Sequence, residues 1–427
     1  MKSRKQQTIG IVDYYSINIR QMWRGLKQEG AAFWLLCIYF FLEYVRPQSI
    51  YPAIDFLPWA QIFIIFAVIA ALAEKSLKWV KNPQSTLIIL FTCVVLLSSL
   101  FAYQPGLALP KLNIVFNWLI LYFLIVSIVN TERRFLIFVL LFLLVSFKMS
   151  QHGFRTFAGR GFSFSNWGVS GAPGWFQNSG EFGIQMTIFV PLSLAFIIAL
   201  RKYWGRLKRL FFYLMPITGL FSIAASSSRG AQLAIAGVGV WFLLKSRMGI
   251  RALVGLAILG ALIYMTIPPE QYARFSTMGS DETSIQRLAY WKFGMQIAQT
   301  NPVFGIGYEN WINYCWFENP TGLGIQQKCE QAHNSFVQAL AELGFPGLLI
   351  TLLMVLHVFR KNRCTRQYAD KHKNVFIKYM AHGLDGGMVG FLISGFFISA
   401  LYYPFIWVQV SMSVVLNEIA KKMESAS

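Results

Sequence analysis

Long apolar runs separated by short polar stretches recur along almost the whole chain. Each run has roughly 17–25 residues, which is the length of a helix that crosses a lipid bilayer. The runs are continuous and do not alternate between apolar and polar positions, so they predict helices and not the strands of a barrel. The pattern therefore indicates an all-α, polytopic membrane protein.

The apolar runs predict about twelve transmembrane helices in a single membrane domain, residues 31–427. The basic segment before them, residues 1–30, contains the amphipathic stretch IVDYYSINIRQMWRGL. It predicts either a helix on the cytoplasmic membrane surface or a disordered tail, and both remain open. The expected spans are residues 31–46, 56–73, 86–103, 112–129, 133–150, 182–200, 208–226, 230–246, 250–268, 334–359, 376–399 and 402–419.

Composition and charge agree with a membrane protein and exclude an ordinary soluble domain. The chain has 427 residues, of which 56% are hydrophobic and 13% are charged, and its formal net charge is +20. In membrane proteins an excess of Lys and Arg marks cytoplasmic loops, so this charge predicts topology and not nucleic-acid binding. With the N-terminus inside, most of the 38 basic residues fall in cytoplasmic loops. Both termini are therefore predicted to be cytoplasmic, and no cleavable signal peptide is expected.

Two long polar segments, about 151–181 and 269–333, then fall on the outer face. Long loops are usually functional or disordered. The many aromatic residues in these segments favour an ordered structure, with short helices in the second. That segment also contains Cys315 and Cys329. Spacing alone fixes no connectivity, so a disulfide and two free thiols both remain open.

Two arginines occupy marked positions on the outer face. Arg229 follows SSS and opens an apolar run, where a guanidinium needs water, a partner or an anion, or else extends to lipid headgroups. Arg287 is predicted in the first turn of an amphipathic surface helix, residues 285–298, with a solvated arginine as the alternative. The following FGIGYEN has Gly305 and Gly307, which allow a ligand to approach the backbone closely.

His333 comes directly before the apolar run that starts with NSFVQALAELG. Asn334 or Ser335 is a suitable N-cap for the predicted helix. A helix N-terminus carries partial positive charge, which favours a bound anion and a neutral imidazole. A neutral imidazole is a competent general base. The alternative is an interfacial histidine that only forms hydrogen bonds.

Together these residues suit a lipid-linked diphosphate donor. Arginine binds phosphate oxygens through two parallel hydrogen bonds, and a neutral histidine can take a proton from an attacking hydroxyl. Because cationic side chains can stabilise the leaving charge, no metal or other cofactor is expected. Glu181 and Glu309 are expected to orient the histidine or to select the acceptor.

The stretches SSSRGAQL, QRLAYW, NPVFGIGYENW and AHNSFVQALAELGFPGLL, in this order over about residues 220–350, resemble the O-antigen ligase/polymerase superfamily. The resemblance implies a metal-independent, inverting glycosyltransferase with the C-type membrane architecture. It further implies an undecaprenyl-diphosphate-linked glycan as donor, at the periplasmic face of a bacterial inner membrane. His333 is then the essential base or the residue that orients the acceptor, and Arg229 and Arg287 contact the diphosphate.

The resemblance assigns the remaining site residues less directly. Arg155 and Arg160, in the first outer segment, are assigned to the diphosphate by position alone. Asn178, in QNSGEFG, resembles an asparagine of the family's outer motif in a divergent form. Glu309 and Asn334 are expected to support the site.

The expected function is that of a ligase in lipopolysaccharide or exopolysaccharide biosynthesis. It would move a glycan to lipid A-core, or to another surface acceptor, while embedded in the bilayer. A repeat-unit polymerase uses the same donor chemistry, as does a protein glycosyltransferase, and both remain open. A flippase or exporter of lipid-linked glycans would place charged residues within its spans, whereas the expected spans are nearly free of charge. Asp385 is a charged residue within an expected span, in the Gly-rich stretch AHGLDGGMVGFLISG. A structural contact is favoured for it over a functional role.

Overall fold

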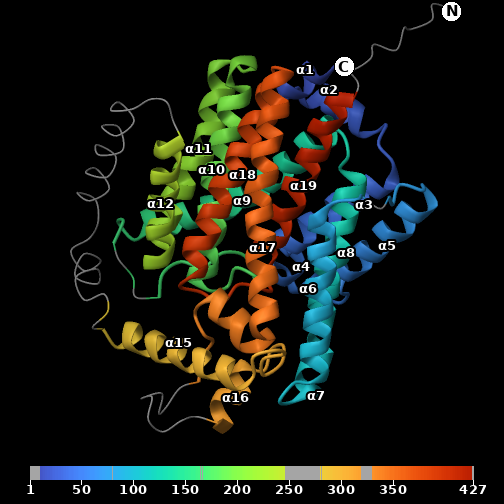
Figure 1. Ribbon diagram of the computed structural model, residues 1–427. Helices are drawn as coiled ribbons and strands as arrows, with labels where there is room; N and C mark the ends of the chain where they lie inside the picture. The colour runs from blue at the N-terminus through green and yellow to red at the C-terminus, as the bar shows by residue number, and fades with distance from the viewer. Residues whose placement is uncertain are drawn as a thin grey trace, which may run out of the picture.

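The computed structural model describes residues 10–78, 80–163, 165, 167–245, 279, 281–318 and 329–425, and these are helical with no strand among them. Most long helices run along one axis of the bundle, and α15 lies across one end (Figure 1). In chain order the helices are α1 (Ile11–Tyr15), α2 (Ile19–Leu26), α3 (Ala31–Val45), α4 (Pro47–Ile50), η1 (Pro52–Ile54), α5 (Trp59–Ala73), α6 (Pro83–Leu100), α7 (Pro105–Ala108), η2 (Leu109–Lys111), α8 (Leu112–Ile128), α9 (Glu132–Gly159), α10 (Ser179–Leu200), η3 (Arg201–Tyr203), α11 (Arg206–Ala225), α12 (Arg229–Lys245), α15 (Glu282–Thr300), α16 (Trp311–Glu318), α17 (Ser335–Lys371), α18 (Val375–Gly395) and α19 (Pro404–Ser425).

Within the described residues a helix lies at each expected span, but only six helices are long and apolar enough to cross a membrane. For the described part of the chain, the prediction of about twelve transmembrane helices is therefore too high. α3 and α5 have 15 residues each, about 22 Å of helix, against a hydrocarbon core of roughly 30 Å. The expected span at 250–268 lies outside the described residues. The six are Pro83–Leu100, Pro105–Ile128, Glu132–Gly159, Ser179–Tyr203, Arg206–Ala225 and Ser335–Lys371.

Two helices continue beyond their expected spans. α9 ends at Gly159, so the outer segment expected from residue 151 begins about two turns later. α17 ends at Lys371 and not near residue 359. Lys, Arg and Gln are good helix formers, so a helix can outlast its apolar run. In the described part of the N-terminal segment, residues 11–15 and 19–26 form α1 and α2, and the position of these helices on a membrane surface stays a prediction.

α10 lies inside the bundle and packs against α9, α11, α12 and α18. Most of its side chains are buried. α18 approaches it through glycines: a Cβ on Gly390 would lie 2.7 Å from the carbonyl oxygen of Thr187. Small residues let helix backbones come this close. The Gly-rich stretch of α18 therefore forms a tight helix contact with α10.

Asp385 makes the predicted structural contact, between α17 and α18. Its Oδ1 accepts a hydrogen bond from Asn362 Nδ2 at 2.8 Å, and its Oδ2 accepts one from Arg366 Nη1 at 2.5 Å. The Asp385 side chain is only 3% exposed. A buried charge of this kind is tolerated when it is paired and hydrogen-bonded, and the contact holds the two helices together.

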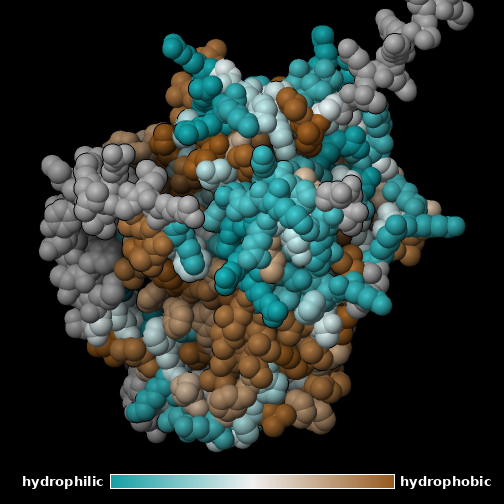
Figure 2. All heavy atoms as spheres, turned by 45° about the horizontal axis from the view of Figure 1, so that its top comes forward, coloured by the Kyte–Doolittle hydropathy of each residue, from teal (hydrophilic) through white to brown (hydrophobic). Residues whose placement is uncertain are grey.

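The two ends of the bundle differ in what they carry. α1, α2 and the end of α19 lie at one end, and α15 and α16 lie at the other (Figure 1). Hydrophilic residues gather over the first end, and a hydrophobic flank lies below it (Figure 2). This arrangement is what a helical bundle with a lipid-facing side requires.

Candidate active site

A cavity of about 630 Å³ lies at the end of the bundle that α15 crosses. Its walls come from the starts of α10, α12 and α17, from α15, and from the segment between α18 and α19. The volume is typical of a small-molecule site. Six of the predicted site residues line this cavity, namely Asn178, Glu181, Arg229, Arg287, Glu309 and His333.

Arg229, the first residue of α12, binds a carboxylate at the cavity. Its Nη1 and Nη2 donate to the two carboxylate oxygens of Asp281 at 2.9 and 3.2 Å. Nη2 also donates to Thr283 Oγ1 at 3.1 Å. Asp281 is itself the N-cap of α15, where it accepts from the Ser284 amide at 3.2 Å. The ion pair thus ties the start of α15 to the start of α12.

The Arg229 guanidinium holds the pKa of Asp281 well below its usual range. A carboxyl group with a depressed pKa stabilises the fold above its unfolded pKa of about 3.9, and this stability is lost as pH falls through the lower folded value. The pair is therefore intact at neutral pH. A diphosphate that binds Arg229 must compete with Asp281 or use the remaining N–H groups of the guanidinium.

A disulfide anchors the segment that carries His333. Cys315, on α16, is bonded to Cys329, and the two Cα atoms are 5.7 Å apart. Of the two possibilities that the spacing left open, the structure has the disulfide. Cys329 lies four residues before His333, so it fixes one end of residues 329–334, called here the His333 segment.

α15 holds the His333 segment through two hydrogen bonds. Trp291 Nε1 donates to the Ala332 carbonyl at 3.2 Å, and the Tyr290 hydroxyl accepts from the Glu330 amide at 3.1 Å. His333 has φ 48°, in the left-handed region. This conformation is uncommon for residues other than glycine and persists where the surrounding contacts determine it.

The other end of the His333 segment is the start of α17. Asn334 is the N-cap, and its side-chain oxygen accepts from the amides of Phe336 and Val337 at 2.9 and 3.0 Å. Of the two predicted caps, the structure therefore uses Asn334. The other, Ser335, donates instead to the Ile398 carbonyl at 2.7 Å. The cap thus fixes the residue directly after His333.

The His333 imidazole is half-buried, with 26% of its side chain exposed. Burial, and then the positive charge of Arg287, lower the pKa of His333, while Glu330 opposes them. The imidazole is therefore neutral near pH 7 and can accept a proton. Its Nε2 lies 3.3 Å from Glu330 Oε2. Because a carboxylate only accepts hydrogen bonds, this contact favours the tautomer with the hydrogen on Nε2, in which Nδ1 has the free lone pair.

Three helices, α10, α12 and α17, begin at the cavity. A helix N-terminus has amide N–H groups without intrahelical partners and a partial positive charge. Arg229, Arg287 and Lys111 add full charges to the same walls. Lys111 is paired with Glu309, Nζ to Oε2 at 2.9 Å. The helix N-termini and Arg287 favour an anion, while Glu181 and Glu309 line the same cavity and Arg229 and Lys111 are already paired with carboxylates.

Asn178 and Glu181 form the cap of α10 on another wall. Asn178 Oδ1 accepts from the Gly180 amide at 2.8 Å, and the Asn178 amide donates to Glu181 Oε2 at 3.2 Å. The side chain of Tyr403 also hydrogen-bonds Glu181. Both predicted residues thus have a clear local role, which is to end the loop and start the helix at the cavity.

The glycines of FGIGYEN approach protein backbone and not the cavity, which neither of them lines. A Cβ on Gly305 would lie 2.5 Å from the Ala341 carbonyl oxygen. The amides of Ile306 and Gly307 donate to the carbonyls of Ala341 and Glu342 at 2.9 and 3.1 Å. The structure therefore assigns these glycines to close packing against α17, where a ligand approach was expected.

The carbonyls of Ala341 and Glu342 can accept these hydrogen bonds because α17 is broken at Gly344. Gly344 has φ 68°, and Pro346 has no N–H to bond the Glu342 carbonyl one turn back. The Glu342 carboxylate, in a residue 1% exposed, accepts from the Trp311 amide at 3.3 Å and from the Tyr402 hydroxyl at 2.9 Å. The break is thus a buried junction that joins α17 to α16 and to the segment before α19.

With this geometry in view, the comparisons with known proteins are informative. Residues 214–352 match the O-antigen ligase family. Over this segment the chain is a member of the O-antigen ligase superfamily. The matched segment contains Arg229, Arg287, Glu309 and His333. Residues 18–199 match a family of unknown function (DUF5935).

A curated relative from another group is also similar to this O-antigen ligase superfamily member. It is a probable peptidoglycan glycosyltransferase, FtsW, of Pseudomonas fluorescens (strain SBW25), 26% identical over 245 residues. The match covers 53% of this chain and 56% of the relative, so the chain spans about half the length of that protein. Together with the apolar helices, these matches indicate a multi-pass bacterial membrane protein of a glycosyltransferase-like family.

The structure does not bring every predicted site residue together at the cavity. Arg155 lies near the end of α9, where its Nε donates to the Gln151 carbonyl at 3.2 Å. Arg160 is the C-cap of the same helix. Neither lines the cavity. Arg287 lies in the second turn of α15, since the helix begins at Glu282 and not at residue 285.

Some residues of the ligase-family cavity were not singled out from the sequence. Gln338 and Ser399 line it, and each has a buried side-chain oxygen with no hydrogen-bond partner among the described residues. Gln338 could have been found from the sequence, because it is a polar residue near the start of an apolar helix. Asp281 could be predicted as a helix N-cap, because it directly precedes the sequence ETS. Its ion pair with Arg229 could not be predicted, because the two residues are 52 positions apart. In the described part of the chain, no group of three or more His, Cys, Asp or Glu side chains is placed to hold a metal ion.

Proposed function

We propose that this member of the O-antigen ligase superfamily transfers a glycan from undecaprenyl diphosphate to an acceptor hydroxyl at the periplasmic face of the inner membrane. The observation that carries the proposal is that Arg229, Arg287 and His333 line one cavity, at which three helices begin. The relative named a probable peptidoglycan glycosyltransferase supports glycosyl transfer as the reaction type.

In the proposed reaction, the acceptor hydroxyl attacks the anomeric carbon of the glycan. A new C–O bond forms to the acceptor as the C–O bond to the diphosphate breaks, and attack from the opposite face inverts the configuration. The hydroxyl proton goes to Nδ1 of His333. The diphosphate leaves with the bonding electron pair, and its charge is stabilised by Arg229, Arg287 and the helix N-termini. These cationic groups perform the role that a metal ion has in other transferases.

The proposed acceptor is lipid A-core or another surface acceptor, which makes the protein a ligase. The same bonds form and break in a repeat-unit polymerase, where the acceptor is a second lipid-linked glycan. The identity of the acceptor therefore separates the two, and the residues at the diphosphate do not.

The test replaces the proposed base in living cells. In a strain that lacks the native gene, His333→Ala is expected to reduce transfer by about 10²–10⁴-fold, which is the usual contribution of a general base. Surface glycan and polyprenyl-linked intermediates are measured together. The matched control is His152→Ala, an exposed histidine on α9 that does not line the cavity.

The outcomes separate the candidate functions. Long chains retained on the polyprenyl carrier, with bare acceptor, are expected for a ligase. Acceptor that bears single repeat units would indicate a polymerase instead. Normal surface glycan in His333→Ala would remove the histidine from the mechanism and return the exporter to consideration.

A further inference from the structure

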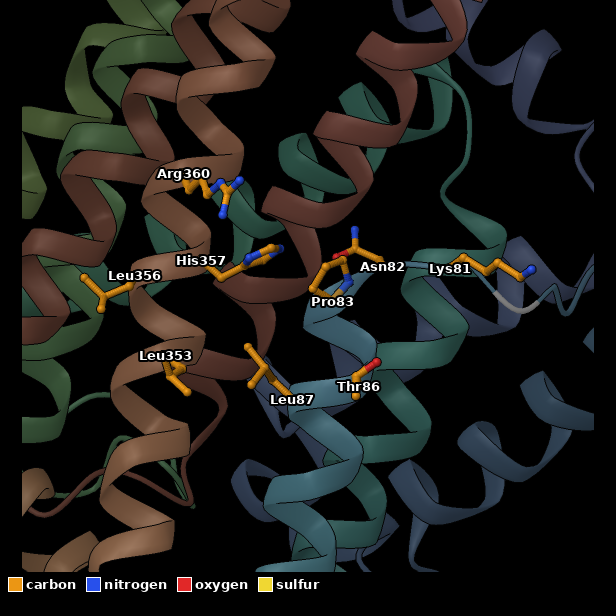
Figure 3. A pocket seen from close by; sticks show the side chains of 9 residues that line it. All are labelled: Lys81, Asn82, Pro83, Thr86, Leu87, Leu353, Leu356, His357 and Arg360. Atoms are coloured by element: carbon orange, nitrogen blue, oxygen red, sulfur yellow. The ribbon is translucent and has the colours of Figure 1, made fainter.

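A second cavity, of about 720 Å³, lies between α6 and α17, away from the proposed active site. Arg360 and His357 lie about seven turns along α17 from His333, so this cavity is close to the opposite end of the bundle. Figure 3 shows the gap between the two helices. The lining residues are Lys81, Asn82, Pro83, Thr86, Leu87, Leu353, Leu356, His357 and Arg360.

One end of this cavity is basic. Arg360 is exposed and lies at this end, and the imidazole of His357 points from α17 toward the start of α6, while the side chain of Lys81 points away from both (Figure 3). The Nε2 of His357 is buried and has no hydrogen-bond partner among the described residues. Asn82 caps α6 by accepting from the Gln84 amide at 2.9 Å. The N-terminus of an 18-residue helix therefore adds partial positive charge.

An acidic residue lies nearby but is already paired. Glu418, on α19, accepts from Asn82 Nδ2 at 3.4 Å and from Lys421 Nζ at 2.7 Å. Among the described residues, the positive charge of Arg360 therefore has no ion-pair partner at the cavity. A group that carries negative charge and accepts hydrogen bonds, such as a phosphate, complements this end.

The rest of the cavity is apolar and continues into exposed leucines. On α17, Leu356, Leu353 and Leu349 have exposed fractions of 63%, 41% and 57%, and they follow Arg360 along one face. On α6, Leu90 is 46% exposed. From Arg360 to Leu349 the helix rises about 16 Å, close to half of the roughly 30 Å hydrocarbon core of a bilayer. The leucines thus cover the depth of one leaflet.

We propose that the cavity between α6 and α17 binds one anionic phospholipid. Its phosphate lies between Arg360 and His357, beside the start of α6, and an acyl chain lies along Leu353 and Leu356. A basic side chain that only extends to the headgroup region needs no cavity and leaves no buried, unpartnered nitrogen one turn deeper. A soluble phosphate would not use the apolar walls. The site is independent of the transfer reaction.

The test is native mass spectrometry of the full chain extracted from vesicles of phosphatidylcholine and phosphatidylglycerol in equal amounts. The unaltered protein is expected to retain one phosphatidylglycerol. Arg360→Ala removes charged hydrogen bonds to the phosphate and is expected to lower retention about tenfold. Leu353→Trp fills the cavity without changing the charge, and the same loss is expected.

The matched control is Arg206→Ala, which removes an exposed charge at the start of α11, away from the cavity. It is expected to retain the lipid like the unaltered protein. If Arg360→Ala and Leu353→Trp both retained as much phosphatidylglycerol as the unaltered protein, the proposal would be overturned, since the lipid is then an ordinary annular one. If Arg206→Ala lost as much phosphatidylglycerol as Arg360→Ala, the proposal would be overturned too, because lipid retention would then depend on the net charge of the protein and not on this cavity.

Two further measurements identify the ligand. Millimolar inorganic phosphate is expected to leave the lipid bound, and displacement would assign the site to phosphate and not to a lipid. In a second set of vesicles, undecaprenyl phosphate replaces phosphatidylglycerol. Retention of that lipid alone would overturn the choice of a phospholipid.

Discussion

Arg229 binds a carboxylate of its own chain at the place where the proposed donor carries its diphosphate. Asp281 takes two parallel hydrogen bonds from the guanidinium, which is the geometry that a phosphate group also uses. The Arg229 side chain is 11% exposed and that of Asp281 25%. The carboxylate is therefore an internal competitor for the leaving group.

Asp281→Asn is expected to lower the KM for the lipid-linked donor by up to about fivefold, because the loss of a partly exposed ion pair frees the arginine. Asparagine also caps helices well, so α15 is expected to keep its start. The measurement is steady-state transfer by the purified protein with a synthetic diphosphate donor. Glu282→Gln, an exposed neighbour in the same first turn, is the control. A higher KM in Asp281→Asn would show instead that the carboxylate positions Arg229.

At the residue scale, the sequence predicts what each side chain can do better than which one it meets. Arg229, Arg287 and His333 were found because arginine and histidine at helix starts are chemically distinctive. Arg155 and Arg160 share that chemistry but lie where α9 ends, away from the cavity. The pairing with Asp281 depends on how two distant segments fold together, and no local pattern carries that information.

At the scale of elements, the His333 segment is short and held at both ends. The Cys315–Cys329 disulfide fixes its start, and the Asn334 cap fixes its end. Cys315 is fully buried against α15. The position of the proposed base therefore depends on a covalent link as well as on α17.

Replacing both cysteines with alanine is expected to destabilise the outer segment by about 3 kcal/mol, since the disulfide closes a loop of 14 residues. It is also expected to lower transfer, because His333 loses an anchor. Thermal unfolding in detergent and transfer by the same samples are compared. The control is Cys93→Ala, a free and exposed cysteine on α6. Unchanged unfolding and transfer in the double variant would contradict this role.

Helices were easier to predict than their ends. The apolar runs located α6, α8, α10 and α11 closely, because burial in lipid requires apolar residues over a fixed length. α17 continues past Phe359 into a basic stretch, since its Lys, Arg and Gln residues favour helix as well as leucine does. Its break at Gly344 has a visible cause in Pro346.

At the scale of the whole molecule, alternating helix directions place α1, α2 and the end of α19 at one end of the bundle (Figure 1). The candidate active site lies at the other end, beside α15. Which helices are neighbours could not be predicted, because similar apolar faces permit many arrangements. The sidedness of the bundle remains a prediction from its basic loops.

That sidedness can be measured with a maleimide that does not cross the membrane. On a background with Cys93 and Cys364 changed to alanine, Glu282→Cys is expected to react in spheroplasts. Lys373→Cys, between α17 and α18, is expected to react only after lysis. Both positions are exposed, so accessibility of the membrane face decides the result. The reverse pattern would place the cavity on the cytoplasmic side.

Three helix N-termini at one cavity have a consequence for how such a protein can diverge. Much of the positive potential there belongs to peptide groups of α10, α12 and α17, and no side-chain substitution removes it. Lining residues such as Trp167, Trp175 and Phe397 can therefore change over generations while attraction for an anion persists. Under the proposed function, the fold itself therefore favours the anionic donor, and the walls that would meet the sugar and its acceptor can vary.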